Sequence, residues 1–442
     1  MKILLILVPG KTFRKAAEDG RPYRSYAATT LMQLSALVPP ELHAEIKILD
    51  LMTTPLPENF YADIVGISTW TCGAPEAYRI ADLARQQGMK VVLGGSHPTQ
   101  MPEEAAWHAD AVVIGHGEQS WPRLLRDYAE NRLRKFYCDD TNPFSQPLPP
   151  LNRQLLDKRR YYFTNCLEAT RGCPNNCQFC VVRNISRGNC WARDVRDVVA
   201  EIETMGRRIA FIDSSITEFT SYAEKLWREL IPLNIRWYSS ATVRFAEDER
   251  AVRLAAKSGC RGVLIGFESV NQAALGGAGK SFNNVRRYRE AIQRLHDCGI
   301  MILGCFVFGF DEDDQSVFER TVEFVTSAGI DLVRYAILTP FPGTPWYEKF
   351  QRDQRILTHD WNLYDTENAV FKPAGMSARQ LEEGWKWAYR ETYRCSSMLK
   401  RVIRKGSPLL LSVPANLLFR KIAREFNAAG SQANEPPAAG TE

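Results

Sequence analysis

The sequence lacks any long apolar run and any recognisable export signal. No stretch of about 18 or more apolar residues occurs, and a helix of that length is what crosses a bilayer. The apolar segment Met1–Val8 runs directly into Pro9, Gly10 and Lys11, without a separate basic region or a small-residue cleavage site. These absences favour a buried first strand over a signal peptide, and we expect a cytoplasmic protein.

Strong compositional bias is missing as well. Of the 442 residues, 45% are apolar and 24% are charged, which is close to an average soluble protein and predicts two or three domains. The 11 cysteines belong to a long chain with no sign of secretion, where clustered cysteines are more often metal ligands or catalytic groups than disulfides. Six are scattered and are interpreted as small buried hydrophobic residues: Cys72, Cys138, Cys260, Cys298, Cys305 and Cys395.

Residues 1–135 alternate apolar, strand-like runs with helical stretches. The expected strands are 2–8, 44–50, 63–68, 90–94 and 111–114, and the expected helices are 25–38, 75–87 and 118–129. Apolar strands separated by helices predict an α/β domain with an open, doubly wound (Rossmann-like) parallel sheet. Ligands of such a domain bind beyond the carboxyl ends of the strands. Residues 136–165, where prolines and polar residues gather, are predicted to be a linker.

A second alternation occupies residues 166–372. Its expected strands are 166–170, 208–213, 235–240, 262–268, 300–308 and 331–338. Six β/α units predict a partial (β/α)6 TIM-like barrel, with its active site in the carboxyl-end loops. Residues 373–426 have the spacing of a helical carboxyl-terminal region. The polar, small-residue segment 427–442 is predicted to be a disordered tail.

The loop after the first strand of the predicted barrel contains three closely spaced cysteines. They are Cys173, Cys177 and Cys180, in the segment Glu168-Ala-Thr-Arg-Gly-Cys-Pro-Asn-Asn-Cys-Gln-Phe-Cys. The glycine, proline and asparagines favour tight turns, which can direct three thiolates to one point. A cubane cluster has four irons, so a local set of three cysteines leaves one iron open to another ligand.

The C-x3-C-x2-C spacing, with aromatic Phe179 before the last cysteine, resembles the signature of the radical S-adenosylmethionine (SAM) superfamily. The resemblance implies a [4Fe–4S] cluster whose open iron chelates SAM, and an external electron donor of the flavodoxin or ferredoxin type. An electron from the cluster would cleave the sulfonium to methionine and a 5′-deoxyadenosyl radical, which abstracts hydrogen from a small-molecule substrate. A structural zinc site is the alternative, and Cys166 or Cys190 would then supply the fourth ligand.

The resemblance places further candidates at the strand ends of the barrel. The expected SAM-binding residues are Phe179, Asp213, Ser239, Arg244, Gly266 and Glu268. Glu268 is also the candidate catalytic residue, and an ordinary strand-end carboxylate is the alternative. Relatives often carry two acidic residues where Asp213-Ser214-Ser215 stands here, so the ribose and amino-group contacts of SAM are left open.

Residues 1–135 resemble the cobalamin-binding-like domain that one radical SAM subfamily carries at its amino terminus. The candidate cobalamin-binding residues are Ser68, Thr69, Gly94, Gly95, Ser96, Thr99, Gly115, Gly117 and Glu118. Glycines at strand ends let the backbone approach a flat macrocycle closely. The cobalt-binding Asp-x-His-x-x-Gly motif is absent, so a domain without cofactor is the alternative. A nicotinamide site is disfavoured because no G-x-G-x-x-G follows the first strand.

Positive charge is concentrated near the carboxyl terminus. From residue 394 to 424 there is no acidic residue and eight basic ones: Arg394, Lys400, Arg401, Arg404, Lys405, Arg420, Lys421 and Arg424. Aliphatic residues lie between them, which suits peripheral contact of 394–424 with an anionic membrane surface. A helical pair packed on the barrel with solvated charges is the alternative. Nucleic acid is disfavoured because the interleaved residues are not stacking aromatics.

Taken with the resemblance, these features predict an enzyme that modifies an unactivated carbon of a small molecule. Cobalamin-dependent C-methylation is the expected outcome, because methyl transfer is the commonest outcome in the subfamily. Radical oxidation, cyclisation, carbon–carbon coupling or rearrangement without methylation is the alternative among enzymes. A metal-stabilised binding protein is the alternative outside enzymes.

Overall fold

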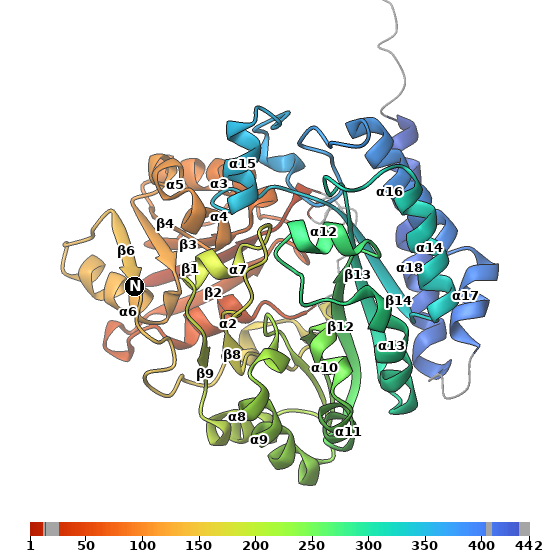
Figure 1. Ribbon diagram of the computed structural model, residues 1–442. Helices are drawn as coiled ribbons and strands as arrows, with labels where there is room; N and C mark the ends of the chain where they lie inside the picture. The colour runs from red at the N-terminus through yellow and green to blue at the C-terminus, as the bar shows by residue number, and fades with distance from the viewer. Residues whose placement is uncertain (12–13, 15–25, 404–408, 433–442) are drawn as a thin grey trace, which may run out of the picture. The chain divides into compact units, whose positions relative to one another are not determined.

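The computed structural model describes residues 1–11, 14, 26–403 and 409–432 (Figure 1). It divides into two compact units. The first unit comprises Met1–Ser239 and Thr339–Asp365, and the second comprises Ser240–Leu338 and Thr366–Glu442. Arg404 and Lys405 of the basic segment lie outside the described residues.

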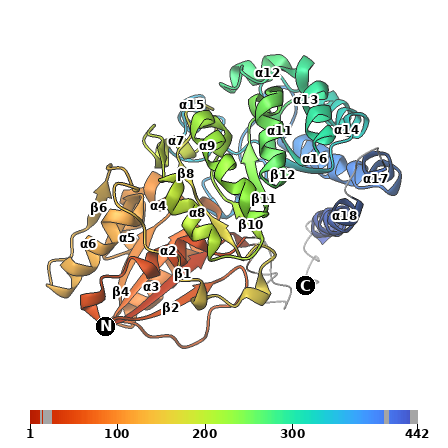
Figure 2. The same cartoon turned by 90° about the horizontal axis from the view of Figure 1, so that it is seen from below.

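The amino-terminal sheet has six parallel strands in the order β2-β1-β3-β4-β5-β6, coloured red to orange in Figure 2. The strands are β1 (Lys2–Val8), β2 (Glu45–Asp50), β3 (Ile64–Thr69), β4 (Lys90–Gly94), β5 (Ala111–Gly115) and β6 (Phe136–Asp139). The helices between them are α2 (Thr29–Ala36), α3 (Ala74–Gln86), α4 (Ser96–Gln100), α5 (Pro102–His108) and α6 (Gly117–Ala129). The predicted doubly wound fold is confirmed, and the strand order reverses direction at β1, where such sheets bind ligands.

Strand β6 is a correction to the sequence prediction, which placed residues 136–139 in a linker. Only Tyr137 of this strand is buried, and its hydroxyl donates a hydrogen bond of 2.9 Å to Asp127. A four-residue edge strand with a single buried side chain has no apolar run that could distinguish it from a loop.

The second sheet also has six strands, in the order β14-β13-β12-β11-β10-β7. They are β7 (Cys166–Leu167), β10 (Arg208–Phe211), β11 (Arg236–Ala241), β12 (Cys260–Glu268), β13 (Met301–Phe308) and β14 (Leu332–Ile337). Helices alternate with them: α8 (Val195–Glu203), α9 (Thr220–Leu230), α10 (Val243–Glu247), α11 (Glu249–Lys257), α12 (Gln272–Gly277), α13 (Tyr288–Asp297) and α14 (Ser316–Ala328). The predicted six β/α units of the barrel are confirmed. Strand β7 is shorter than expected because the chain leaves the sheet to form a small hairpin.

The carboxyl-terminal region is helical, as predicted, with α16 (Ala378–Thr392), α17 (Cys395–Val402) and α18 (Leu409–Gln432). The backbone of residues 427–432 continues α18, residues 433–442 lie outside the described residues, and the predicted disorder of the tail stays a prediction. Adding Ala428 and Ala429 to an existing helix requires no new nucleus, and alanine has the highest helix propensity. Among the described residues, no helix combines the length and apolar content needed to cross a membrane.

A buried hydrogen bond ties residue 161 to the carboxyl end of β2. The Tyr161 hydroxyl donates to a carboxylate oxygen of Asp50 at 2.8 Å, and the other oxygen accepts from the Met52 amide at 2.9 Å. Burial raises the pKa of Asp50 above its ordinary value, against the opposing effect of these hydrogen bonds.

We expect Tyr161→Phe to lower the free energy of unfolding by about 1–2 kcal/mol, because a buried carboxylate loses a donor. Urea unfolding followed by circular dichroism measures the change. Tyr162→Phe is the matched control, since Tyr162 is exposed and should change stability by less than about 0.5 kcal/mol. Equal effects of the two substitutions would contradict the role given to the Asp50–Tyr161 bond.

Candidate active site

A two-stranded hairpin joins the two ends of the loop that contains the three cysteines. Strand β8 (Thr170–Arg171) precedes it and pairs in antiparallel orientation with β9 (Trp191–Ala192), which follows it. Gly172 has φ +81°, and a Cβ there would overlap the carbonyl of Asn189. The hairpin therefore closes the loop into a compact unit, and only glycine fits at the point of closest approach.

All three predicted cluster ligands, Cys173, Cys177 and Cys180, are half-buried thiols in this loop. The Asn175 side-chain amide donates to Cys173 Sγ at 3.5 Å and to a carboxylate oxygen of Glu218 at 3.0 Å. Within the described part of the chain, no three metal-binding side chains converge as a single ion would require. A cubane does not require this, because each thiolate binds a different iron. The donor set fits a [4Fe–4S] cluster with three protein ligands.

The other two nearby cysteines differ in their surroundings. The buried Cys166 thiol donates to the carbonyl of Phe163 at 3.1 Å, and burial raises its pKa to about 11. The Cys166 sulfur is thus engaged by a backbone carbonyl at the start of β7. Cys190 is exposed at the end of the loop, and its Cα lies 3.3 Å from where a Cβ on Gly172 would stand.

Asp213, predicted to bind SAM, lies buried after β10 and holds the start of the cysteine loop. Its carboxylate accepts hydrogen bonds from the Ala169 amide at 3.1 Å, the Thr170 amide at 2.5 Å and the Thr170 hydroxyl at 2.6 Å. Burial raises the pKa of Asp213 to about 7, against the effect of these donors. Its observed partners fix the backbone three residues before Cys173, and its role toward SAM stays a prediction.

Arg171 joins the cysteine loop to the amino-terminal sheet. Its largely buried guanidinium forms ion pairs with Glu118, at the start of α6, at 2.5 Å and with Glu168 at 2.7 Å. It also contacts Nδ1 of His116 at 3.2 Å. Burial alone would lower the pKa of Arg171, but the two carboxylates outweigh it and hold the pKa above its ordinary value. Sequence reasoning missed this residue, although it lies within the cysteine motif.

The glycine-rich strand ends of the amino-terminal sheet are tied together by two threonine hydroxyls. Thr69 donates to the carbonyl of Val8 at 2.9 Å, joining the ends of β3 and β1. Thr99 donates to the carbonyl of Gly95 at 2.7 Å and accepts from the amide of Gly115 at 3.0 Å, joining the ends of β4 and β5. Both hydroxyls therefore hold neighbouring strand ends together. Their predicted contact with cobalamin stays a prediction.

Several polar atoms at this same edge are buried without a partner. They are His97 Nδ1, Gln100 Nε2, His116 Nε2 and Glu118 Oε2, all in the segments that follow β4 and β5. Burial, and then the charge of Arg171, lower the pKa of His116 to about 4, so its ring is neutral at pH 7. Since Arg171 donates to Nδ1, Nε2 carries the proton and is an unused donor. The edge thus presents unused donors and acceptors, which suit the amide side chains around a corrin ring.

The remaining predicted cobalamin residues lie at the same carboxyl-end edge. Ser68, Gly94, Ser96 and Gly117 are half-buried there. A Cβ on Gly95, whose φ is +100°, would stand 2.6 Å from the Thr69 carbonyl oxygen, so two strand ends approach closely. Gly95 is thus required by the close approach of β3 to the end of β4, and its predicted contact with cobalamin stays a prediction.

In the second unit, Glu268 ends β12 at a break in its register with β13 and has φ +65°. Its carboxylate forms a buried ion pair of 2.5 Å with Lys280, whose ammonium also donates to the carbonyl of Gly266 at 3.0 Å. A Cβ on Gly266 would overlap the Glu268 carboxylate. Gly266 is thus required by the ion pair, and Lys280 is a partner that the sequence pattern did not indicate.

The other predicted SAM residues have the following surroundings. In the first unit, Phe179 packs near Trp346 with ring centroids 5.9 Å apart, and Ser239 is buried in β11. In the second unit, the Arg244 guanidinium lies 4.2 Å from the ring centroid of Phe282. Their contacts with SAM stay predictions.

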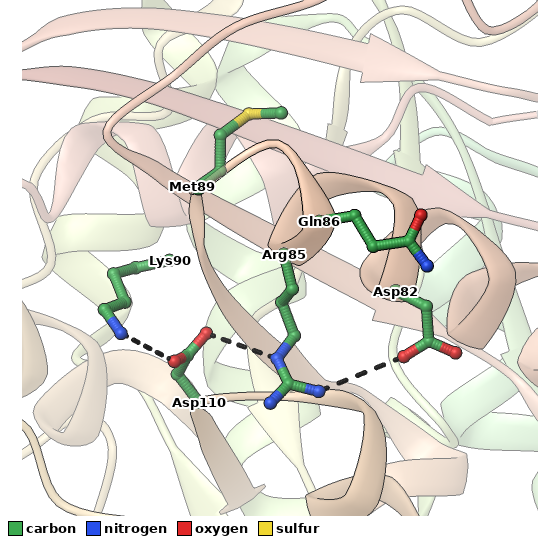
Figure 3. A pocket seen from close by; sticks show the side chains of 7 residues that line it. Asp82, Arg85, Gln86, Met89, Lys90 and Asp110 are labelled. Carbon is green, nitrogen blue, oxygen red and sulfur yellow. Dashed lines mark hydrogen bonds and ion pairs between the residues drawn. The ribbon is translucent and has the colours of Figure 1, made fainter.

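A surface pocket of the first unit lies away from these groups. It is lined by Asp82, Arg85, Gln86, Gly88, Met89, Lys90 and Asp110 (Figure 3). Asp110 pairs with Lys90 at 2.9 Å and with Arg85 at 3.7 Å, so its charges are compensated internally. Because Lys90 begins β4, the pocket lies at the amino-terminal edge of the sheet, opposite the edge where ligands of this fold bind.

Two family models match the chain. The radical SAM superfamily model matches residues 167–325, and the B12 binding domain model matches residues 45–125. A bacteriochlorophyllide d C-12(1)-methyltransferase of Chlorobaculum tepidum is 31% identical over 383 residues, which cover 84% of this chain and 83% of that protein. A bacteriochlorophyllide d C-8(2)-methyltransferase of the same organism is 28% identical, over 89% of this chain and 92% of that protein.

Solved structures share the fold. The radical SAM methyltransferase TsrM from Kitasatospora setae, with cobalamin and a [4Fe–4S] cluster bound, has a TM-score of 0.66 and 15% identity, over 96% of this chain and 99% of that chain. The cobalamin-dependent SAM radical enzyme OxsB has a TM-score of 0.67 and 14% identity, over 96% of this chain and 72% of that chain.

Two parallel sheets and a three-cysteine loop after the first strand of the second sheet define a radical SAM enzyme. The chain belongs to the radical SAM superfamily, in the group that carries an amino-terminal B12-binding domain. Its cofactors are a [4Fe–4S] cluster, SAM and cobalamin.

We expect Ala at position 173, 177 or 180 to abolish formation of 5′-deoxyadenosine from SAM and to remove the visible iron–sulfur absorbance after anaerobic reconstitution. Cys72→Ala and Cys395→Ala are controls that should retain both signals. Retained SAM cleavage in any one of Cys173→Ala, Cys177→Ala or Cys180→Ala would contradict the ligand assignment.

We also expect Arg171→Met to lower the free energy of unfolding by about 3 kcal/mol, because Glu118 is left as a buried, unpaired charge. The double variant Arg171→Met/Glu118→Met should recover most of that loss, since it removes both charges. Urea unfolding of the wild type, Arg171→Met, Glu118→Met and the double variant measures the coupling. A loss of unfolding free energy in the double variant equal to the sum of the losses in the two single variants would contradict the ion pair.

Proposed function

We propose that this enzyme transfers a methyl group from SAM to an unactivated carbon at the periphery of a chlorin-type tetrapyrrole. The observation that carries the proposal is the 31% identity, over 84% of this chain, to a methyltransferase that acts on bacteriochlorophyllide d. The second bacteriochlorophyllide methyltransferase, at 28% identity, supports the same substrate class.

The residues of the first unit bring the two cofactor-binding regions together. When bound, the cluster supplies the electron that cleaves SAM, and cobalamin supplies the methyl group. Asp213 fixes the backbone before Cys173, and Arg171 holds the same strand against the start of α6. Buried His116 and Glu118 offer an unused donor and an unused acceptor to amide groups of the corrin. The chain's own contribution is thus to hold the cluster and cobalamin within one compact unit.

The atom and charge balance of the reaction shows which reactants the enzyme must take from outside. A substrate R–H and two SAM cations give R–CH3, S-adenosylhomocysteine, methionine and 5′-deoxyadenosine. Charge balances only if two electrons enter, one at a time, since the cluster is a one-electron centre. We therefore include an external donor of the flavodoxin or ferredoxin type in the proposal.

A second candidate is oxidative ring closure without methyl transfer. It is favoured by similarity to the anaerobic magnesium-protoporphyrin IX monomethyl ester cyclase of Rubrivivax gelatinosus, which is 25% identical over 81% of this chain. The lower identity places it behind methylation. Both candidates act on a cyclic tetrapyrrole, so the substrate class does not depend on the choice.

We expect the reconstituted enzyme to retain hydroxocobalamin through gel filtration. With a bacteriochlorophyllide acceptor and a flavodoxin reducing system, it should form S-adenosylhomocysteine and 5′-deoxyadenosine in equal amounts, with a product heavier by one CH2 unit. The control is the same assay without cobalamin, which should yield no methylated product. Formation of 5′-deoxyadenosine without S-adenosylhomocysteine, unaffected by cobalamin, would refute methylation and favour the ring-closing alternative.

A further inference from the structure

The last helices of the second unit expose large aliphatic side chains. Leu399 and Ile403, one helical turn apart at α17, are 60% and 65% exposed, and Leu417 in α18 is 54% exposed. Val413 and Leu418 are also exposed on α18. Helices α16, α17 and α18 contact one another and are drawn in blue in Figure 1. We call these five side chains the tail face.

Among its described side chains, α18 buries two polar residues and exposes several aliphatic ones, while Phe419 stacks on Tyr393 with ring centroids 5.7 Å apart. Ser412, Asn416 and Ala423 form its buried side, whereas Val413 and Leu417 face outward. A helix that packs on a protein core in water normally buries its aliphatic residues and exposes its polar ones. The exposed aliphatic side chains leave an apolar surface that needs another partner.

A buried arginine of α17 holds Asn416 of α18. The Arg401 guanidinium donates to the carbonyls of Asp331 at 2.8 Å and Thr392 at 2.9 Å, and to the side-chain oxygen of Asn416 at 3.1 Å. The Asn416 amide in turn donates to the carbonyls of Asp331 at 3.0 Å and Ser412 at 2.9 Å. This network holds Asn416 inward, and Val413 and Leu417, which lie beside it on the helix, are exposed.

Cations border the tail face. Lys400, Lys421 and Arg424 are exposed, and within the described part of the chain no ion pair includes them. Two other basic residues have partners: Arg394 pairs with Glu391, and Arg420 donates to Cys395 Sγ at 2.7 Å. The residues from 394 to 424 include eight basic side chains and no acidic one, and the first acidic residue after them is Glu425.

We propose that the tail face is a docking surface for an anionic lipid membrane. Exposed aliphatic side chains that enter the acyl boundary, with lysine and arginine beside them at headgroup level, are the two components of peripheral binding. Charge complementarity selects an anionic lipid surface over a neutral one. A second copy of this chain would oppose like charges across the contact, which disfavours self-association.

Flotation of the full-length, reconstituted enzyme with vesicles tests the proposal. Vesicles of phosphatidylcholine with phosphatidylglycerol should bind the enzyme, and vesicles of phosphatidylcholine alone should bind it much more weakly. Leu417→Ser/Leu418→Ser should lower partitioning to the anionic vesicles by about tenfold or more, through lost apolar burial. Lys421→Gln/Arg424→Gln should lower it by roughly 30-fold, at about 1 kcal/mol for each cation.

The matched control is Leu357→Ser/Leu363→Ser, which makes the same change at two exposed leucines of the first unit and should leave binding unchanged. Unaltered 5′-deoxyadenosine formation shows that each variant is folded. Equal vesicle binding by the wild type and both tail-face variants would overturn the proposal. So would a wild-type dimer that Leu417→Ser/Leu418→Ser converts to monomer without any vesicle binding, because a second copy would then cover the face.

Discussion

The ion pair between Arg171 and Glu118 is the interaction on which the active-site arrangement depends. It places a strand of the cysteine hairpin against the loop that follows β5, which is the edge where the amino-terminal domain offers unused polar atoms. Its guanidinium is largely buried, so leaving either partner unpaired is costly. The same arginine contacts His116 and so leaves Nε2 of that ring as the free donor. One side chain thus contacts both the cysteine loop and the edge of the amino-terminal sheet where unused polar atoms lie.

Around this contact, each functional loop is held by polar ties from outside its own segment. Asp213 holds the residues before Cys173, and Thr99 ties the ends of β4 and β5. In the second unit, the buried Glu268–Lys280 pair holds the end of β12 in a left-handed backbone conformation. Irregular loops gain precise positions only when such bonds over-determine them. The bonds that hold these loops are buried or partly buried.

Much of the fold could be predicted because its strands are buried and apolar. Every strand that the sequence analysis expected appears in the structure, with boundaries shifted by a few residues at most at all but β7. The failures are short elements: β6 buries one side chain, and α4 spans only five residues. Helix α18 extends into residues 427–432 from a longer helix, which their own composition does not indicate. Tertiary pairing and helix continuity are not local properties of a sequence.

The cluster ligands could be predicted because the spacing of the three cysteines is itself the signature of the site. The site could not be predicted where a function depends on partners far apart in the chain, such as Arg171 with Glu118 or Arg401 with Asn416. Tracing the methyl group of SAM tests the central claim most directly. With deuterated methyl SAM, cobalamin and a bacteriochlorophyllide acceptor, the account predicts a product that carries the intact deuterated methyl group. A turnover product without that label would contradict it.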